Sequence, residues 1–471
     1  MKVTAPLVIK KLLSLKFPGI CQLAPRKITE KRLEMRTDKN TSVWEKDTER
    51  KSFPSLEGNI SADVLIIGGG IAGILCAYKL KKAGVNCILV EAKEILSGIT
   101  KNTTAKITIA HGLIYDKLIR RFGENKARLY LSAQTEACEE YRRLAEVYPC
   151  DYEVRDSFVY TLGNKRKIER ELTALGRLGV KAEFSDAPEL PFSVAGAVRV
   201  GEQAQFNPLK LLFSLSEGLS IFEHTKVVQL MPNKAVTDKG EISFNRVIVA
   251  THFPILNKHG LYPLKLYQHR SYVIALEGAK TLHGMYVDDS DTGLSLRGCG
   301  ELLLLGGGGH RTGKRGGCWQ ELEDIAEKYY KGARIVGRWA AQDCMTLDGV
   351  AYIGRYSKRT PDVFVATGFN KWGITNSLVA ANILADLVRD RDNPYAEVFS
   401  PSRTILRPQL AINALESLLG LITPTVPRCP HLGCALRFNP AEHSWDCPCH
   451  GSRFAENGEL IDNPATDDKR L

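Results

Sequence analysis

Residues 62–91 read ADVLIIGGGIAGILCAYKLKKAGVNCILVE and decide the fold of this chain. Residues 62–67 are an apolar run typical of a buried parallel strand, and residues 74–83 have the pattern of a helix. Residues 87–90 are a second apolar run, with Glu91 at its carboxyl end. A strand, a glycine-rich turn, a helix, a strand and an acidic residue in this order predict a dinucleotide-binding unit.

The three glycines of the turn have separate expected roles. Gly68 allows the tight turn, Gly70 lets a pyrophosphate approach the backbone, and Gly73 lets the helix pack closely on the strand. The phosphates would then face the free N–H groups at the start of the helix. Glu91, 18 residues after Gly73, is placed to accept a hydrogen bond from a ribose hydroxyl. The pattern does not separate FAD from NAD, and an ordinary glycine-rich turn is the structural alternative.

Length and composition set the class of the protein. A chain of 471 residues usually holds two or three domains, and 44% apolar and 25% charged residues are typical of a globular protein. Eighteen uninterrupted apolar residues occur nowhere, so we predict no membrane span. The net charge is 64 − 53 = +11, of which residues 1–34 supply +6. The remaining charge is too small and scattered to indicate a nucleic-acid-binding protein.

The amino-terminal residues 1–34 are basic and weakly amphipathic. A secretory signal is the alternative reading, but three lysines interrupt its apolar core and no small-residue cleavage site is clear. Met35 opens a more ordinary polar leader, which suggests an upstream start codon or a disordered tail. Residues 36–60 have the character of an extended arm. Without a clear signal or span, we expect a cytoplasmic protein.

The loop at residues 97–108, SGITKNTTAKIT, is rich in small hydroxylated residues that can donate hydrogen bonds to a pyrophosphate and an isoalloxazine ring. A plain polar loop is the alternative. The pattern of the rest predicts helices at 111–148, 165–178 and from 374, a strand pair at 151–162, and strands at 221–230, 241–251, 267–276, 292–297, 301–305 and 363–367. Between the last two strands, a glycine run at 306–309 precedes a loop that carries His310 and Arg311.

We therefore predict an α/β fold with a discontinuous dinucleotide-binding domain, whose pieces lie near 62–110, 221–255 and 338–392. The segments between these pieces would form an antiparallel-sheet cap over the ligand. The expected divisions of the chain are a leader and arm at 1–60, this oxidoreductase domain at 61–400, a linker helix at 401–428 and a small β domain at 429–471.

Residues 60–400 resemble the FAD-dependent oxidoreductases of the D-amino-acid-oxidase-like family, with glycine oxidase and sarcosine oxidase as relatives. The matching stretches are IIGGGIAG with Glu91, TKNTTAK at 100–106, RVIVAT at 246–251, DGVAYIG at 348–354 and ATGFNKWGIT at 366–375. The resemblance implies a Rossmann-like FAD domain of the glutathione-reductase type, FAD as cofactor and hydride removal from a C–N bond. The flavin contacts that it implies are Gly68, Gly70, Gly73, Glu91, Thr104, Ala105, Val227, Gly368, Lys371, Gly373, Ile374 and Thr375.

A second chemical centre lies in residues 429–453, CPHLGCALRFNPAEHSWDCPCHGSR. Cys429 with His431, and Cys447 with His450, give two thiolates and two imidazoles, one of each from each half. A zinc finger groups Cys with Cys and His with His, so structural zinc is the weaker alternative. A Rieske [2Fe–2S] cluster, in which two His replace two Cys on one iron, fits the arrangement.

This segment resembles the disulfide-bearing Rieske domains of cytochrome bc and b6f complexes, because C-x-H-L-G-C and C-P-C-H-G-S are both intact. The resemblance implies a disulfide between Cys434 and Cys449. Only residues 404–428 precede the first cluster loop, so half of the usual β scaffold is missing. They predict one helix at 408–422, whose apolar face (Ala411, Leu415, Leu418, Ile422) is expected to dock on protein.

The function indicated is a flavoprotein oxidoreductase that oxidises a small amine or amino acid and passes electrons through the cluster to an external acceptor, either a protein or a quinone-like molecule. Arg297 is the candidate clamp for a substrate carboxylate, with His310 and Tyr267 as weaker cap candidates. One alternative is a monooxygenase or reductase in which electrons flow from cluster to flavin. Another is an electron carrier or redox sensor without a dedicated substrate.

Overall fold

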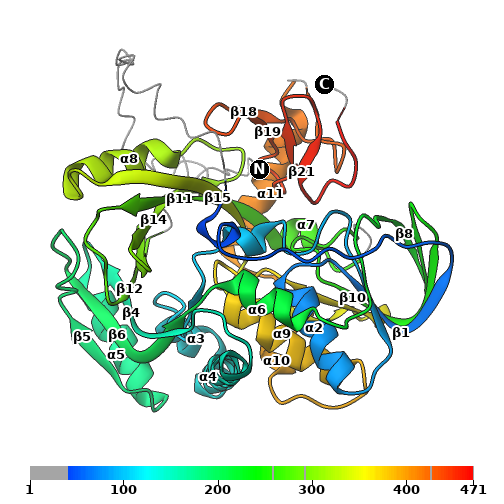
Figure 1. Ribbon diagram of the computed structural model, residues 1–471, viewed down its shortest axis with the longest axis horizontal. Coiled ribbons are helices and arrows are strands. Elements are labelled where there is room, and N and C mark those ends of the chain that lie inside the picture. Colours follow the sequence, from blue (N-terminus) through cyan, green and yellow to red (C-terminus); the bar gives the residue numbers. More distant parts are fainter. Residues whose placement is uncertain (1–40, 257–258, 291–292, 425–426, 470–471) are drawn as a thin grey trace, which may run out of the picture. The chain divides into compact units, whose positions relative to one another are not determined.

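The computed structural model describes residues 41–256, 259–290, 293–424 and 427–469. The predictions made for residues 1–34 and for Met35 lie outside these residues. The described part of the chain forms three β-sheets with helices packed on them (Figure 1). The α/β fold with an antiparallel cap and a small carboxyl-terminal β-sheet is confirmed.

The first sheet is the dinucleotide-binding sheet. Its main path runs β16–β17–β10–β1–β2–β7, and all neighbours from β17 to β7 are parallel. The short strands β8 and β9 extend from β10 as an antiparallel branch. Its strands are β1 (Ile60–Ile67), β2 (Cys87–Val90), β7 (Ile221–Phe222), β8 (Val227–Met231), β9 (Lys234–Thr237), β10 (Glu241–Val249), β16 (Tyr352–Ser357) and β17 (Thr360–Thr367).

Close backbone packing fixes the start of this sheet. Gly68 has φ +110°, and a Cβ there would lie 2.6 Å from the carbonyl oxygen of Ala250. A Cβ on Gly73 would lie 1.9 Å from the carbonyl oxygen of Gly68. A side chain at Gly68 would therefore separate β1 from β10. A side chain at Gly73 would separate α2 from β1, as the sequence predicted.

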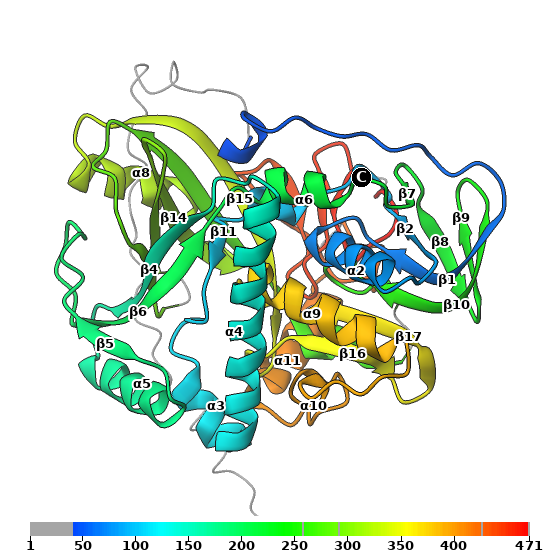
Figure 2. The same ribbon diagram turned by 60° about the horizontal axis from the view of Figure 1, so that its bottom comes forward.

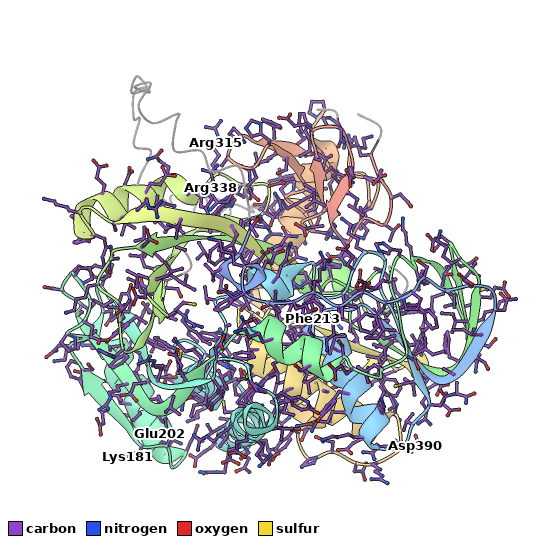
Figure 3. The ribbon with its side chains drawn as sticks, in the orientation of Figure 1. Lys181, Glu202, Phe213, Arg315, Arg338 and Asp390 are labelled. Carbon is purple, nitrogen blue, oxygen red and sulfur yellow. The ribbon has the colours of Figure 1, made fainter. Side chains whose placement is uncertain are left out.

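Helices on one side of the sheet enclose the main hydrophobic core. Helices α2 and α9 pack against each other, and the long α4 runs beside α9 (Figure 2). Phe213 of α6, labelled in Figure 3, is buried in the same core. The helical segments here are η2 (Val43–Glu45), α2 (Ile71–Lys82), η3 (Ile99–Asn102), α3 (Tyr115–Phe122), α4 (Glu124–Val147), α6 (Pro208–Leu215), α9 (Gly373–Leu387) and α10 (Ala396–Phe399).

The second sheet is the cap, with the order β15–β11–β14–β13–β12–β4–β6–β3 and β5 beside β6. Helix α8 packs on β11 and β14, α5 packs on β5 and β6, and the short α7 leads into β11. These elements are β3 (Lys106–Ile107), β4 (Glu153–Thr161), α5 (Lys165–Arg177), β5 (Ala182–Ser185), β6 (Gly196–Gln205), α7 (Tyr262–Lys265), β11 (Leu266–Glu277), β12 (Met285–Asp288), β13 (Ser295–Cys299), β14 (Leu302–Arg311), α8 (Cys318–Tyr329) and β15 (Arg334–Thr346).

Three details of the cap differ from the prediction. Residues 151–162 form the single strand β4, because its partner is the distant β6 rather than a neighbouring hairpin strand. The glycine run at 306–309 lies inside β14, which continues through His310 to Arg311. Residues 338–346 belong to β15 of the cap and not to the dinucleotide-binding sheet, since β15 pairs along its length with β11.

The third sheet, drawn in red in Figure 1, has the order β18–β19–β20–β21. It is preceded by α11 (Pro408–Ile422) and consists of β18 (Arg437–Asn439), β19 (Ser444–Asp446), β20 (Arg453–Ala455) and β21 (Leu460–Asp462). A Cβ on Gly420 of α11 would lie 2.4 Å from Sγ of Cys449, so this helix packs directly against the cluster loops. Helix α11 therefore takes the place of part of the missing scaffold.

The orientation of α11 is opposite to the prediction. Its polar residue Asn413 is buried, whereas Leu415, Leu418 and Ile422 are 56%, 55% and 64% exposed. Ala411 is exposed as well. Polar contacts explain this orientation, because Arg311 donates a hydrogen bond to Asn413 and Lys314 forms an ion pair with Glu416. Among the described residues, none of the helices has the length and apolar character needed to cross a membrane.

We predict that Gly73→Ala destabilises the protein by about 1–3 kcal/mol, because the added methyl group must displace the backbone at Gly68. Gly176→Ala is the matched control, since a Cβ on this α5 glycine meets nothing within 4 Å and alanine favours helix. Thermal unfolding measures both. An unchanged or higher Tm for Gly73→Ala would contradict the close-packing argument.

Candidate flavin and iron-sulfur centre

A cavity of about 360 Å³ lies at the carboxyl ends of the parallel strands. Gly68 and Gly70 line it where β1 meets α2, and a Cβ on Gly70 would meet only the hydroxyl of Thr100, at 3.5 Å. The cavity therefore reaches the exposed backbone at the start of α2, where N–H groups and the helix dipole favour a phosphate. This cradle fits the pyrophosphate of FAD.

Glu91 lines the same cavity at the end of β2. Its two carboxylate oxygens accept hydrogen bonds from the backbone N–H groups of Gly69 (2.7 Å) and Lys93 (2.9 Å). Burial raises the pKa of Glu91, against the effect of these N–H donors. A carboxylate has about four acceptor sites, so Glu91 can still accept a hydrogen bond from a ribose hydroxyl, as the sequence predicted.

Most other predicted flavin contacts lie around this cavity. Val227, Gly368, Lys371, Gly373 and Ile374 line it, and the last of these begin α9. Thr104 lines a second cavity instead. Ala105 and Thr375 are buried behind the cavity walls; Thr375 is hydrogen-bonded to His111 at 2.9 Å.

The second cavity, of about 440 Å³, lies between the cap and the first cavity. It holds both basic and acidic side chains, among them Lys106, Asp288 and Asp343. Six residues line both cavities and mark where they meet: Thr103, Ala341, Asp343, Asn370, Lys371 and Ile374. A substrate in the second cavity would thus reach a ring held at the inner end of the first.

Lys106 is a residue that the sequence did not single out. Its ammonium donates to the hydroxyls of Thr104 (3.0 Å) and Ser295 (2.6 Å) at the wall of the second cavity. Burial, and then the charge of Arg297, lower the pKa of Lys106 to about 7. The side chain can therefore exchange a proton near neutral pH. In the sequence it was one polar residue of a hydroxylated loop, and only the fold buries it.

Arg297 does not line either cavity, and its predicted role as a substrate clamp stays a prediction. The guanidinium is buried and donates to the carbonyl oxygens of Thr104 (2.7 Å), Ala105 (2.8 Å) and Gly298 (3.0 Å). Ala105 has φ +53°. Arg297 therefore holds the loop at 104–105 in an unusual backbone conformation.

The other two catalytic candidates differ in position. His310 lies outside both cavities, with Nε2 3.2 Å from the hydroxyl of Tyr272 and 3.7 Å from Sγ of Cys318. Its neighbour Tyr272 donates a hydrogen bond to Glu442, which precedes β19 of the third sheet, and the predicted catalytic role of His310 stays a prediction. Tyr267 does line the second cavity, and the guanidinium of Arg311 lies 5.0 Å from the centre of its ring.

The two cluster loops have the same backbone. In each, a glycine N–H donates 2.9 Å to a cysteine carbonyl four residues earlier, Gly433 to Cys429 and Gly451 to Cys447. Both glycines have positive φ, +77° and +88°. This turn brings the cysteine and the histidine of each loop to one place, since C-x-H and C-x-x-H fall inside it.

The four predicted iron ligands fit a cluster. Cys429 and Cys447 are buried and contact each other, and the rings of His431 and His450 lie 5.0 Å apart at 86°. Burial lowers the pKa of His431 to about 4 and that of His450 to about 3, so both are neutral at pH 7, as ligands must be. Among the described residues, Nδ1 of His450 has no hydrogen-bond partner although it is buried. An iron would satisfy it.

The remaining cysteines of these loops, Cys434 and Cys449, are free thiols in the structure. With Cys447 they form a group whose sulfur atoms lie within 4.8 Å of one another. The disulfide implied by the resemblance is therefore not formed in this structure, although the two thiols are neighbours. It stays a prediction.

The cluster loops and the flavin cavity are separated by one short segment. Ala250, Thr251 and His252 line the flavin cavity directly after β10. The next residue, Phe253, is fully buried, and its ring centre lies 6.3 Å from those of both His431 and His450. The imidazole edge of the cluster site therefore faces the flavin domain.

The third sheet also closes the flavin cavity, which the sequence did not predict. Leu460, Ile461 and Asp462 of β21 line it, together with Asn463. Asn463 donates to the carbonyl oxygens of Thr251 and Phe253. These contacts join residues more than 200 positions apart, so no local pattern could indicate them.

Comparison with known proteins agrees with both centres. The family model described as FAD dependent oxidoreductase matches residues 63–387, and that of the Rieske [2Fe-2S] domain matches residues 408–470, so the second match includes α11. The Rieske 2Fe-2S iron-sulfur protein YhfW of Bacillus subtilis is 34% identical over 90% of this chain and 96% of its own length. Gamma-glutamylputrescine oxidoreductase of Escherichia coli is 24% identical over 77% of this chain and 93% of its own.

Among solved structures, glycine oxidase from Geobacillus kaustophilus has a TM-score of 0.63 at 18% identity and covers 73% of this chain and 99% of its own. In the cluster region, cytochrome b6-f complex iron-sulfur subunit 3 of Nostoc is 48% identical over 8% of this chain and 22% of its own. The chain therefore belongs to the FAD-dependent oxidoreductases of the D-amino-acid-oxidase family and carries a Rieske [2Fe–2S] domain at its carboxyl end.

Proposed function

We propose that this protein oxidises a small amine or amino acid at FAD and sends the electrons through its own Rieske cluster to an external acceptor. The contact of Phe253 with both His431 and His450, directly after three residues that line the flavin cavity, is the observation that carries this proposal. When bound, FAD removes a hydride from a C–N bond, and a [2Fe–2S] cluster takes one electron at a time. A short, buried connection between the two sites suits that transfer.

The substrate class is supported by the names of the relatives and by the second cavity. Gamma-glutamylputrescine oxidoreductase and glycine oxidase are named for an amine and an amino acid. The cavity of about 440 Å³, with charged side chains and a common wall with the flavin cavity, has the size and polarity for such a molecule. This cavity favours an enzyme over an electron carrier without a dedicated substrate.

The residues of this chain would have the following roles in the reaction. Gly70 and Glu91 hold the pyrophosphate and ribose, and the start of α9 at Gly373 faces the ring with its positive dipole end. Lys106 takes the proton of a substrate ammonium group, because only a neutral amine loses a hydride readily. Cys429, His431, Cys447 and His450 hold the cluster.

Gly70→Val should leave the fold intact and abolish FAD binding. A Cβ at this position meets only Thr100 in the protein, and the branched side chain would extend into the pyrophosphate position. Flavin absorbance after reconstitution with FAD measures the loss, and the Tm of the flavin-free protein, compared with flavin-free wild type, controls for folding. Wild-type flavin content in the variant would contradict the assigned cradle.

Cys447→Ser should remove the cluster and stop electrons from leaving the flavin by this path. We expect wild-type protein, mixed anaerobically with an amine substrate, to lose its flavin absorbance and then to give the electron paramagnetic resonance signal of a reduced Rieske cluster. The variant should bleach its flavin and give no such signal. Cys138→Ser, a half-buried cysteine far from the loops in sequence, is the control. A cluster that stays oxidised in substrate-reduced wild type would refute the proposed direction.

Lys106→Met should lower kcat by about 100-fold near pH 8, the magnitude typical of a lost general base. In wild type, kcat should rise as the pH increases through about 7, because Lys106 loses its proton there and can then accept one. The variant should lose this part of the pH profile. Lys117→Met, an exposed lysine at the same cavity, should keep it. An unchanged profile in Lys106→Met would show that another group accepts the proton.

A further inference from the structure

Helix α11 presents its polar side to the protein and its apolar side to solvent. Asn413 donates to the carbonyl of Leu264 (3.0 Å) and accepts from Arg311 (3.0 Å), and Glu416 forms an ion pair with Lys314 at 2.7 Å. The opposite face carries side chains that are 43–64% exposed: Ile412, Leu415, Leu418, Leu419, Leu421 and Ile422. A helix of a globular protein normally shows the reverse arrangement.

The apolar surface continues beyond the helix. Leu406, just before α11, is 80% exposed. At the other end, the side chain of Leu421 comes within 3.9 Å of the position that a Cβ on Gly433 would take, and the neighbouring Leu432 of the first cluster loop is 45% exposed. One apolar strip thus runs from residue 406 along α11 to the loop that carries Cys429 and is called the α11 strip below.

The composition of the α11 strip fits lipid better than protein. Every large exposed side chain in it is Leu or Ile, whereas protein-binding sites depend on Trp, Tyr and Arg anchors and under-represent Leu. The only acidic residue of α11, Glu416, lies on the inner side with Lys314. Arg407, whose guanidinium lies 5.3 Å from the centre of the Phe122 ring, precedes the helix, and Arg428 donates to the carbonyl oxygens of Leu421 and Gly433 (both 2.9 Å) at its other end, so that both ends of the helix carry a half-buried positive charge. Basic ends and a purely aliphatic middle complement an anionic lipid surface.

We propose that the α11 strip binds this protein to anionic membranes, with α11 lying in the plane of the lipid surface and not across it. The helix has 15 residues and is roughly 22 Å long, shorter than the about 30 Å hydrocarbon core of a bilayer. Its ion-paired and hydrogen-bonded inner side stays on the protein, so the aliphatic side chains enter the headgroup boundary without exposing a charge. The net charge of +11 adds a general attraction to such a surface.

The test uses the full-length protein, loaded with FAD and cluster, in sedimentation with phosphatidylcholine vesicles that do or do not contain phosphatidylglycerol. Wild type should bind the vesicles with phosphatidylglycerol, more weakly at high salt and more weakly without the anionic lipid. The triple variant Leu415→Gln, Leu418→Gln, Ile422→Gln should bind at least about 100-fold more weakly, since each buried aliphatic side chain contributes roughly tenfold. Its flavin and cluster absorbance should stay unchanged, because more than half of each of these side chains is exposed.

The matched control replaces three equally exposed valines elsewhere: Val147→Gln, Val154→Gln and Val228→Gln, which are 67%, 49% and 57% exposed. This variant should bind like wild type. If the triple α11 variant does not fold, the single change Ile422→Gln should lower binding about tenfold. Wild type that binds neither vesicle, or an α11 variant that binds like wild type, would overturn the proposal. So would a dimer that the α11 changes convert to a monomer while neither form binds lipid, because the strip would then cover a second copy.

Discussion

The buried carboxylate of Glu442 holds the iron-sulfur part of the molecule on the flavin part. It accepts hydrogen bonds from Arg270 of the cap, from Arg453 of β20 (2.8 Å) and from the hydroxyl of Tyr272 (2.8 Å). Burial raises the pKa of Glu442, but the two guanidinium groups outweigh it and hold the pKa at about 2. A carboxylate so buried must stay paired, so the third sheet has one favourable position on the cap.

Short distances between the cluster loops and the cap also fix that position. A Cβ on Gly451 would lie 2.2 Å from the side chain of Gln268, and one on Gly313 would lie 2.6 Å from the nitrogen of Pro448. Gln342 of β15 donates 2.9 Å to the carbonyl of Gly451. The cluster loops thus use strands of the cap as scaffold on one side and α11 on the other. This arrangement explains how a shortened Rieske domain keeps its loops in place.

The same docking shapes both chemical sites. Because β21 and Asn463 cover the flavin cavity, the flavin site is complete only when the third sheet is present. Because Phe253 contacts both cluster histidines, the imidazole edge is turned toward the flavin domain. Helix α11 then lies on the outer side of the cluster domain, and its polar residues contact the cap. The apolar residues of α11 therefore lie on its solvent-exposed side.

The sequence by itself determined the features that depend on neighbouring residues. The turn from Gly68 to Gly73 and the acid at Glu91 follow from spacing along one strand and helix, and the two cluster loops follow from their C-x-H and C-x-x-H turns. Local geometry allows few alternatives in such segments, so their chemistry could be predicted before any fold was known.

The tertiary structure decided the roles of single side chains whose partners are distant in the chain. Arg297 had the right chemistry for a carboxylate, yet the fold directs it to backbone carbonyls at 104–105. Lys106 became a candidate base only through burial. The apolar face of α11 was expected to be inside, but ion pairing and hydrogen bonding with residues 311–314 turned it outward. Hydrophobic pattern gives a helix two faces, and only the partners that the fold supplies decide which face is buried.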